Sequence, residues 1–591
     1  MGFFPRKTPA DQSVEEPAPI APAADPEKTA QAHDRSLEKD NINDLITKDA
    51  QAGIQKVEAV TAVWSKTHLI LAYTFIWLFY VIQSIQEVAI SVYTPYVTSA
   101  FQLHSLTAAT SIVATIVAGL VKLPLSKILD TWGRPQGLGL MLLIFTLGFI
   151  MMAACNSVTT FAAADVFYSV GSQGVSYVLT IFIADTSTLK SRALMLSFAT
   201  SPYIFTTWAA GPITDSVLGE GGMGWRWGIG MWAIIVPVVI TPLVFLFLWN
   251  QRKAEKMGIL ESQGKLRHIS AGGIWKFIID VDLFGVLLLG GGMALFLLPF
   301  SLYSYQGDGW RSPMIIAMIV VGVVLVAAFV AWEKFGAPVT FIPFKLLADR
   351  TVFFGGFMFV FVFANSSIWG AYFYSMLPVV WETSASQTTY IGNIYRTGSC
   401  FFSIIISALI YRTGRFKPFA LYFLVPLMML GVGLMIHFRQ PDQSVGYIIM
   451  TQIFVAFAGG PIVICGEMAM LSPSDHQHVA VIMAILDLFG SVGSSIGSTI
   501  AAAIWTGTFY ENLLKYTPEG TDVASIYASI VAQTSYASGT PTRDGIDKAY
   551  GETQRIMCIT AVSLLVGALA CVAMWRNLNV KNIKQVRGNV V

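Results

Sequence analysis

Charged residues are scarce in this chain, and their scarcity excludes most soluble functions. Only 12% of the 591 residues are charged, whereas soluble domains carry about 25%. Hydrophobic residues make up 54%, and the mean hydropathy is +0.62. So few charged residues cannot keep the surface of a soluble enzyme hydrated, which excludes that class of protein. The net charge of +2 gives no bulk field that would attract a polyanion, so a nucleic-acid partner is not expected.

Cysteine and histidine are also few and scattered. The five cysteines lie in apolar stretches without CxxC spacing, so no disulfide framework is expected. Among the seven histidines, His476 and His478 form the one close pair, in an expected inner loop, where it is weak evidence for a metal. Membrane acyltransferases and desaturases need histidine clusters at a membrane face, and a direct iron channel needs rings of carboxylates. We therefore expect no enzyme activity, no cofactor and no metal bound by the protein.

Residues 1–66 differ in composition from everything that follows. They contain six prolines, interspersed charges and few large apolar side chains. Such a segment cannot bury a core, so we expect a disordered cytosolic tail. No apolar run follows Met1, so a cleaved signal peptide is not expected, and the first span would serve as the targeting signal.

From His68 onward, the chain contains fourteen apolar stretches long enough to cross a bilayer. One crossing needs about 20 residues and must be helical, because lipid cannot satisfy backbone polar groups. The predicted spans are 68–96, 106–129, 136–154, 159–184, 193–214, 227–249, 283–303, 313–332, 352–380, 388–410, 418–438, 446–470, 478–505 and 555–575. Lys and Arg concentrate in the loops on the side of the N-terminal tail, so both termini are expected in the cytosol.

The longest predicted outer loop is 506–553, between spans 13 and 14. It contains five tyrosines among Gly, Ser, Thr and scattered charges. Long loops in compact proteins are often lids or binding loops, and a solvated connector is the alternative. After span 14, residues 577–591 form the expected cytosolic C-terminal tail.

A short motif recurs after spans 2 and 10. The two copies share the pairs Gly133-Arg134 and Gly414-Arg415. Gly permits a tight turn between helices, and Arg offers donors to helix carbonyls or to a neighbouring carboxylate. The first copy adds Asp130, which can cap a helix or pair with an arginine. A plain hairpin with positive charge on the inside is the alternative reading of each copy.

The positions of this repeat divide the chain into matching parts. We predict six-helix bundles over 67–250 and 351–576, separated by a cytosolic loop and two extra helices over 251–350. Duplicated halves of this kind are typical of secondary transporters.

The segment Leu129-Asp130-Thr131-Trp132-Gly133-Arg134 resembles the inner-loop motif of the major facilitator superfamily. It departs from that motif at Ser126, where Gly is usual, and at Thr131, where Arg is usual. The resemblance covers spans 1–14. It implies an all-α membrane protein with 14 transmembrane helices in a 6+2+6 arrangement.

Further segments resemble the fungal siderophore–iron transporters, which are fourteen-span ferric-siderophore/proton symporters of that superfamily. The segments are Gln86-Glu87, Tyr93-Thr94-Pro95-Tyr96, Asp165-Val166-Phe167-Tyr168, Gly224-Trp225-Arg226-Trp227-Gly228, Tyr390-Ile391-Gly392-Asn393-Ile394-Tyr395 and Ala549-Tyr550-Gly551-Glu552-Thr553-Gln554-Arg555. The resemblance implies proton-coupled uptake of a ferric siderophore, of hydroxamate type, by alternating access. Its implied partners are the ferric siderophore, protons and the lipid bilayer, and the expected state is a monomer. The expected location is the plasma membrane, with a cytoplasmic vesicle membrane as the alternative.

Ionisable residues inside the predicted spans are the strongest functional candidates, because lipid makes them costly. Away from span ends they are Glu87, Lys122, Asp165, Arg396, Glu467 and Asp487. They occupy spans 1, 2, 4, 10, 12 and 13, which line the cavity in the resembled fold, and the peripheral spans 3, 6, 11 and 14 have none. In spans 1 and 4 the helical spacing also places Gln83 and Glu87, and Asp165 and Tyr168, on polar stripes.

Glu87 is our first candidate for the carboxylate that carries the proton inward. Glu467 and Asp487 are second candidates, and Asp165 is a further one near the outer end of span 4. Lys122 and Arg396 are candidate counter-ions or substrate contacts. A structural ion pair is the alternative at each position.

Aromatic and amide side chains suit a bulky, nearly neutral ferric chelate, whereas helix packing is their alternative role. The predicted substrate-binding residues are Tyr80, Gln83, Lys122, Asn365, Trp369, Tyr372, Tyr395, Arg396 and Tyr550. Tyr550 is included because the last outer loop is linked to substrate handling in the resembled family.

The nearest alternative function is a fourteen-span proton-coupled drug or toxin exporter of the same superfamily. Such exporters carry a motif ending Gly-Pro-x-x-Gly-Gly in span 5. Here Gly211-Pro212 is followed by Ile213, Thr214 and Asp215, so the second Gly pair is absent. Its absence weakens the case for export. A nutrient sensor with a transporter fold is a further alternative.

Overall fold

The computed structural model describes residues 63–103, 107–187, 189–219, 221–257, 275, 278–279, 282–303, 306–338, 347–473 and 479–582. Within these ranges every regular element is a helix, as expected for an all-α protein. The predicted N-terminal tail up to residue 62, the loop histidines His476 and His478, and the C-terminal tail from residue 583 lie outside the described residues.

The helices fall into two long series with a short series between them. The first series is α3 (Lys66–Ala100), α4 (Thr107–Thr131), α5 (Arg134–Ala154), α6 (Val158–Thr186), α7 (Leu189–Ala199), α8 (Tyr203–Leu218), α9 (Gly224–Gly230) and α10 (Trp232–Lys256). The middle series is α12 (Leu283–Leu297), α13 (Pro299–Leu302), the 3-10 helix η3 (Gly309–Arg311) and α14 (Pro313–Phe335).

The last series completes the second half of the chain. It comprises α16 (Arg350–Gly370), α17 (Phe373–Val380), α18 (Ala385–Thr413), α19 (Lys417–Phe419), the π-helix η4 (Ala420–Leu424), α20 (Val425–Phe438), α21 (Val445–Leu471), α22 (Val479–Tyr516), α23 (Val523–Ala528), α24 (Ile530–Thr534), α25 (Pro541–Met574) and the 3-10 helix η6 (Val580–Asn582).

Eleven helices within the described residues are long and apolar enough to cross a membrane. They correspond to predicted spans 1, 3, 4, 6 and 8–14. Predicted span 2 is α4, span 5 is divided between α7 and α8, and span 7 is α12, and these are not among the eleven. The count of fourteen crossings therefore stays a prediction.

One apolar stretch predicted as a single helix has a break that shapes the centre of the molecule. Between α16 and α17, Tyr372 adopts a left-handed conformation with φ of 57°. Few residues other than Gly, Asn and Asp adopt this backbone conformation, so the surrounding packing must stabilise it at Tyr372. The Tyr372 ring stacks on Trp505 of α22, with centroids 3.9 Å apart and planes at 9°.

The predicted loop over 506–553 is largely helical, which corrects the sequence analysis. α22 continues to Tyr516 because Phe509 and Leu513 are buried on its inner face. α25 begins at Pro541, where the Thr540 side chain accepts a hydrogen bond from the backbone of Arg543 at 3.3 Å. The connection is thus 517–540, and it contains α23 and α24.

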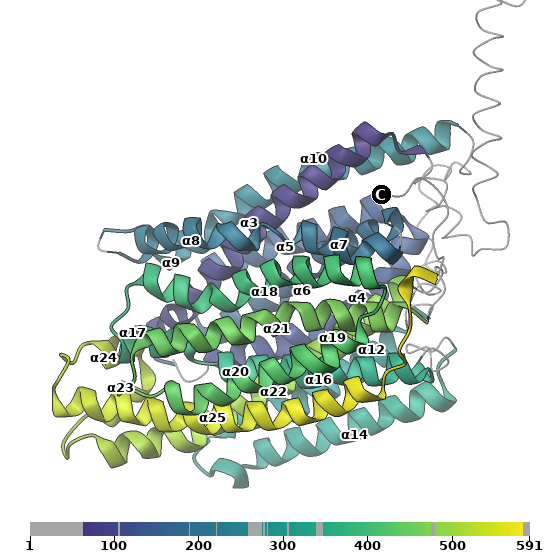
Figure 1. Ribbon diagram of the computed structural model, residues 1–591. Coiled ribbons are helices and arrows are strands. Elements are labelled where there is room, and N and C mark those ends of the chain that lie inside the picture. Colours follow the sequence, from purple (N-terminus) through teal and green to yellow (C-terminus); the bar gives the residue numbers. More distant parts are fainter. Residues whose placement is uncertain are drawn as a thin grey trace, which may run out of the picture.

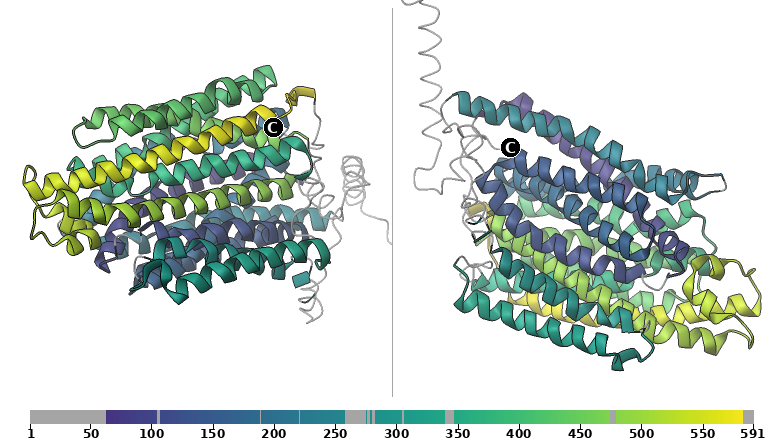
Figure 2. Two further views of the ribbon diagram at one scale, coloured as in Figure 1. Left: turned by 90° about the horizontal axis from the view of Figure 1, so that it is seen from below. Right: turned by 180° about the vertical axis from the view of Figure 1, so that it is seen from behind.

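The long helices run roughly parallel and form two bundles packed side by side (Figure 1). α4 with α22, and α7 and α8 with α18, form most of the contact between the halves. α17 and α24 lie at one end of the molecule, and α7 and α19 lie at the other (Figure 1). The extra helix α14 lies at the edge in every view, packed on α12 (Figures 1 and 2).

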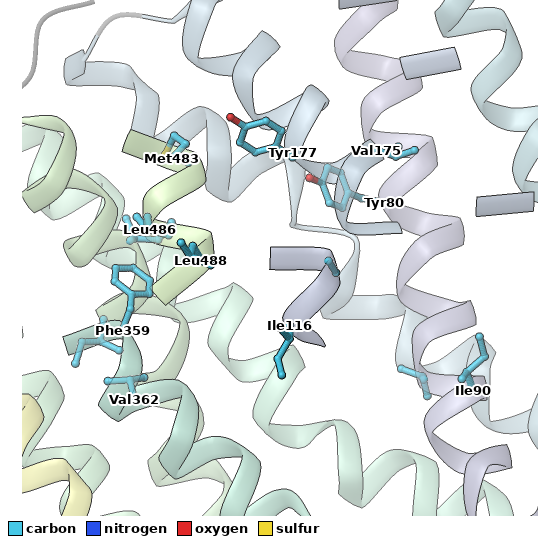
Figure 3. Packing of buried hydrophobic residues seen from close by; sticks show 14 of the residues in the cluster. Tyr80, Ile90, Ile116, Val175, Tyr177, Phe359, Val362, Met483, Leu486 and Leu488 are labelled. Carbon is cyan, nitrogen blue, oxygen red and sulfur yellow. The ribbon is translucent and has the colours of Figure 1, made fainter. Parts of the chain in front are cut away.

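The buried apolar side chains of both halves form one continuous cluster. Figure 3 shows part of it, with Tyr80 and Ile116 from the first half and Phe359 and Leu486 from the second. This continuous packing fixes the relative positions of the helices of both halves.

Candidate functional site

A cavity of about 510 Å³ lies between the two halves of the protein. Its walls come from α3, α4, α5 and α6 of the first half and from α16, α17, α18 and α22 of the second. Pockets that bind small molecules commonly enclose about 300–1,000 Å³. Among the lining residues are three of the charged side chains predicted from the sequence, Glu87, Asp165 and Arg396.

Glu87 and Arg396 form an ion pair that crosses from one half to the other. The Arg396 guanidinium donates to Glu87 Oε2 over 2.9 Å, and the two residues are 309 positions apart in the chain. Gln83 donates to Glu87 Oε1 at 2.8 Å, and the Tyr203 hydroxyl donates to Oε2 at 3.0 Å. Three donors therefore hold one carboxylate in place at the interface between the halves.

The polar stripes predicted for spans 1 and 4 face each other. Gln83 of α3 donates to the Ser172 hydroxyl at 3.3 Å and accepts from the Ser176 hydroxyl at 3.1 Å, and both serines are on α6. Gln86 donates to the Tyr168 hydroxyl at 3.2 Å. Tyr80 lies one helical turn before Gln83 and is buried in the core, away from the cavity lining.

A second ion pair between the halves lies beside the cavity. Lys122 of α4 is 3.0 Å from Asp487 Oδ2 on α22, and it also donates to Gln173 Oε1 at 2.9 Å. Gln173 lines the cavity, so Lys122 contacts the lining through this amide. Glu467 on α21 lies within electrostatic range of Asp487, and its Oε2 atom is buried without a hydrogen-bond partner among the described residues.

Asp165 differs from the other charged side chains of the cavity because it has no cation beside it within the described part of the chain. Its one hydrogen bond is a long one, from the Ser169 hydroxyl at 3.4 Å on the same helix. Its carboxylate belongs to the cavity lining, close to Phe161 and Tyr168 along α6.

Among the predicted aromatic and amide contacts, only Tyr372 lines the cavity. The Trp369 ring packs edge-on against Tyr395, with centroids 5.3 Å apart. Asn365 is fully buried, and in its better-satisfied orientation its amide donates to the Ala561 carbonyl of α25 at 3.0 Å. These three side chains pack helices against one another.

Tyr550 is fully buried away from the cavity. Its hydroxyl donates to Gln533 Oε1 of α24 at 2.8 Å, and its ring packs edge-on against Trp505 and Phe509. In this position it supports the fold of the outer connection.

The two Gly-Arg motifs occupy helix ends on the side opposite to α24 (Figure 1). Gly133 and Gly414 have φ of 118° and 75°, which side chains with a Cβ rarely adopt. Arg134 donates to Asp185 Oδ2 at 3.3 Å, as an arginine of this type was expected to do. Arg415 is exposed, and the Asp130 side chain lies outside the described residues.

Several residues of the site were not predicted from the sequence. Tyr203 bonds Glu87, and Tyr374 lines the cavity near Arg396. Arg439 is buried and donates to the Trp369 carbonyl at 2.6 Å. Arg439 directly follows predicted span 11, and an arginine just after a span is normally predicted to lie in a loop. The hydropathy pattern therefore did not indicate that Arg439 is buried.

Direct contacts join the halves on both sides of the cavity. At the end that holds α24, Ser386 donates from its backbone to Asp215 Oδ1 at 2.9 Å and from its hydroxyl to Oδ2. The Ile530 backbone of α24 also donates to Ser99 Oγ at 3.2 Å. At the opposite end, the hydroxyls of Ser197 and Ser407 are 2.9 Å apart.

The fold and the cavity between two bundles define a membrane transporter of the major facilitator type. Residues 76–332 match the Major Facilitator Superfamily. A solved structure, an inward-facing bacterial homologue of the human lysosomal transporter Spinster, shares the fold with a TM-score of 0.50 and 13% identity. The match covers 87% of this chain and 98% of that one.

Curated relatives narrow this class further. The chain is 49% identical to MFS siderochrome iron transporter 1 of Ajellomyces capsulatus, over 93% of this chain and 94% of that protein. It is 38% identical to MFS siderochrome iron transporter B of Aspergillus fumigatus, over 100% and 95%. The chain belongs to the siderophore–iron transporters of the major facilitator superfamily, which confirms the resemblance noted in its sequence. These relatives are transporters and not enzymes, as expected from the sequence.

Proposed function

We propose that the protein imports iron as an intact ferric siderophore, of hydroxamate type, by alternating access coupled to protons. The observation that carries the proposal is the cavity between the two halves, crossed by the Glu87–Arg396 pair, in a chain whose relatives are named siderochrome iron transporters. The iron stays within its chelate, so the protein supplies walls for the ligand and not ligands for the metal.

Alternating access requires the contacts on the two sides of the cavity to break in turn. On the side of α24 these are the contacts of Ser386 with Asp215 and of Ile530 with Ser99. On the other side it is the contact of Ser197 with Ser407. A hydrogen bond of this kind contributes only about 0.5–1.5 kcal/mol, so none of these contacts by itself locks its side.

The proposed coupling acts through the ion pair of Glu87. A proton on the Glu87 carboxylate removes the charge that attracts Arg396, so the attraction between the halves weakens when Glu87 is protonated. Outward opening therefore becomes linked to proton binding from the acidic side, and release inside restores the pair. Among the candidate carboxylates, Glu87 is the strongest choice because it lines the cavity and also accepts hydrogen bonds from three donors.

Glu467, Asp487 and Lys122 form the second candidate site for protons. A charged carboxylate oxygen without a donor is costly to bury, which favours a proton on Glu467 in at least one state of the cycle. The nearby Lys122–Asp487 pair joins the two halves as the Glu87–Arg396 pair does. A proton at either site is thus able to change the attraction between the halves.

The proposed substrate contacts follow from the cavity lining. Tyr168 and Tyr374 offer flat faces to a bulky chelate, and Ser367 and Ser498 offer hydroxyls to its amide and hydroxamate oxygens. A hydroxamate chelate of iron carries little charge and many such oxygens. We propose a plasma-membrane location and a monomer, which fluorescent tagging and the mass of the purified protein would test.

Uptake of radioactive iron supplied as a ferric trihydroxamate tests the function directly. The full chain is expressed in cells without siderophore uptake of their own, with and without an inward proton gradient. We expect gradient-driven accumulation by the wild type and its loss in Glu87→Gln at unchanged surface level. Glu511→Gln, which changes an exposed carboxylate on α22, is the matched control.

Three outcomes would contradict parts of the proposal. Accumulation that ignores the gradient would refute proton coupling, and normal uptake by Glu87→Gln would remove Glu87 from the mechanism. Faster loss of a preloaded chelate, without uptake, would favour an exporter.

A further inference from the structure

The charges of the side chains that line the central cavity do not sum to zero. Within the described residues, Glu87, Asp165 and Arg396 are the charged groups of its lining. Glu87 and Arg396 neutralise each other across 2.9 Å. Beside the lining, Lys122 and Asp487 neutralise each other across 3.0 Å, and Glu467, which interacts with Asp487, is not part of the lining. An ionised Asp165 therefore leaves the cavity with one uncompensated negative charge.

Among the described residues around Asp165, none supplies a group that would compensate this charge. Its one hydrogen bond is the 3.4 Å contact with the Ser169 hydroxyl. The Arg396 guanidinium, which also lines the cavity, is held by Glu87 and lies over the ring of Tyr203, 5.4 Å from its centroid. A carboxylate without a cation inside a partly enclosed site is costly unless it takes up a proton or the occupant brings a positive charge or a donor, and the ionised form is the one that selects by charge.

We propose that Asp165 determines the charge selectivity of the transporter, an inference that rests on the proposed function. The residue favours ferric chelates that bring a positive group, such as a trihydroxamate with a free ammonium group, over the same chelate without that group. It acts against anionic chelates, such as a ferric tricatecholate with three negative charges. Charges act more strongly in a partly enclosed cavity than in bulk water, and like charges brought together there are repelled.

This role differs from the proton coupling predicted for Asp165 from the sequence. In the part of the chain that the structure describes, Asp165 forms no ion pair between the halves, so its protonation releases no such contact. Its carboxylate instead faces the space that the ligand fills. Selectivity by charge requires only that the carboxylate and the ligand meet in the cavity.

The test compares two ferric trihydroxamates that differ at one group. One carries a primary ammonium group, and the other carries the same nitrogen acetylated and neutral. Uptake of each is measured over a range of concentrations with the full-length protein, in cells that lack their own siderophore uptake. The readout is the ratio of the two KM values, which does not depend on how much protein reaches the membrane.

The wild type should take up the ammonium form with the lower KM. Asp165→Asn should reduce this preference about tenfold, and Asp165→Glu should retain it. Asp544→Asn removes an exposed carboxylate on α25 outside the cavity and should leave the ratio unchanged. A ferric tricatecholate should compete poorly with uptake by the wild type and better with uptake by Asp165→Asn.

Equal KM values for the two chelates in the wild type would overturn the inference, and this measurement does not depend on any variant folding. An unchanged ratio in Asp165→Asn would overturn it as well. Either result leaves the proposed function intact, because the chelates still enter. If neither chelate enters wild-type cells, the proposed function itself fails, and the inference fails with it.

Discussion

The ion pair between Glu87 and Arg396 should hold the two halves of the protein together. Glu87→Gln and Arg396→Gln each remove this attraction while they preserve the approximate size and polarity of the side chain. We expect both variants to shift the molecule away from the closed arrangement, because the pair is a direct charged contact between α3 and α18.

The structure sets the size of the shift. The side chains of Arg396 and Glu87 are 38% and 21% exposed, so the pair is neither on the surface nor fully buried. Surface pairs contribute about 0–1 kcal/mol, and removal of one partner of a buried pair costs about 3–5 kcal/mol. We expect about 1–3 kcal/mol, which corresponds to about a 5- to 150-fold change in the equilibrium between closed and open forms.

Distance measurements between spin labels provide the assay. Labels at Met223→Cys and Glu519→Cys, both exposed at the end that holds α24, report separation of the halves there. Cys400 is partly exposed and is changed to Ser, whereas the other four cysteines are buried. Glu511→Gln serves as the control for loss of an exposed charge.

The double variant sharpens the test. Both single changes remove the same contact, so their effects should not add, and the double variant should shift the distances about as far as either one. The reasoning is refuted if both single variants keep the wild-type distances, or if their effects add fully.

Three further predictions concern other contacts in the structure. Lys122→Gln and Asp487→Asn should each reduce the initial rate of chelate uptake about tenfold, because each change leaves one charge unpaired. The double variant should recover part of the rate. A double variant slower than both single variants would contradict this prediction. Arg543→Lys should speed hydrogen exchange in α24, since lysine lacks the fork that bonds the Gln533 carbonyl at 3.0 Å, and unchanged exchange would contradict that role. Tyr550→Phe should lower the free energy of unfolding by about 1 kcal/mol through loss of the bond to Gln533, with an unchanged KM; a raised KM would return Tyr550 to the ligand site.

Hydropathy, charge and one repeated motif were enough to predict the class of protein. These features are local or additive along the chain, so they can be evaluated without knowing which helices contact one another. The apolar runs had to become helices to cross lipid, and within the described residues eleven helices are long and apolar enough to do so. The glycines of the repeat, Gly133 and Gly414, have the backbone conformation that the tight turns required.

The same local reasoning failed where distant contacts decide the structure. The 506–553 segment reads as a loop because it is polar, yet Phe509 and Leu513 find buried partners and extend α22 to Tyr516. Asn365 was predicted to contact the substrate, but its side chain meets α25 and not the cavity. Periodicity shows which residues share a helix face, and only packing shows what that face meets.

The sequence by itself determined that a small set of charges must lie inside a helical membrane transporter, because ionisable residues in apolar spans are rare and costly. The tertiary structure alone decided their partners. Glu87 meets Arg396 across 309 positions, Lys122 meets Asp487, and Asp165 faces the cavity without a cation among the described residues. The physical reason is that a charge interacts over a few ångströms of space, and the packing of the helices sets those distances.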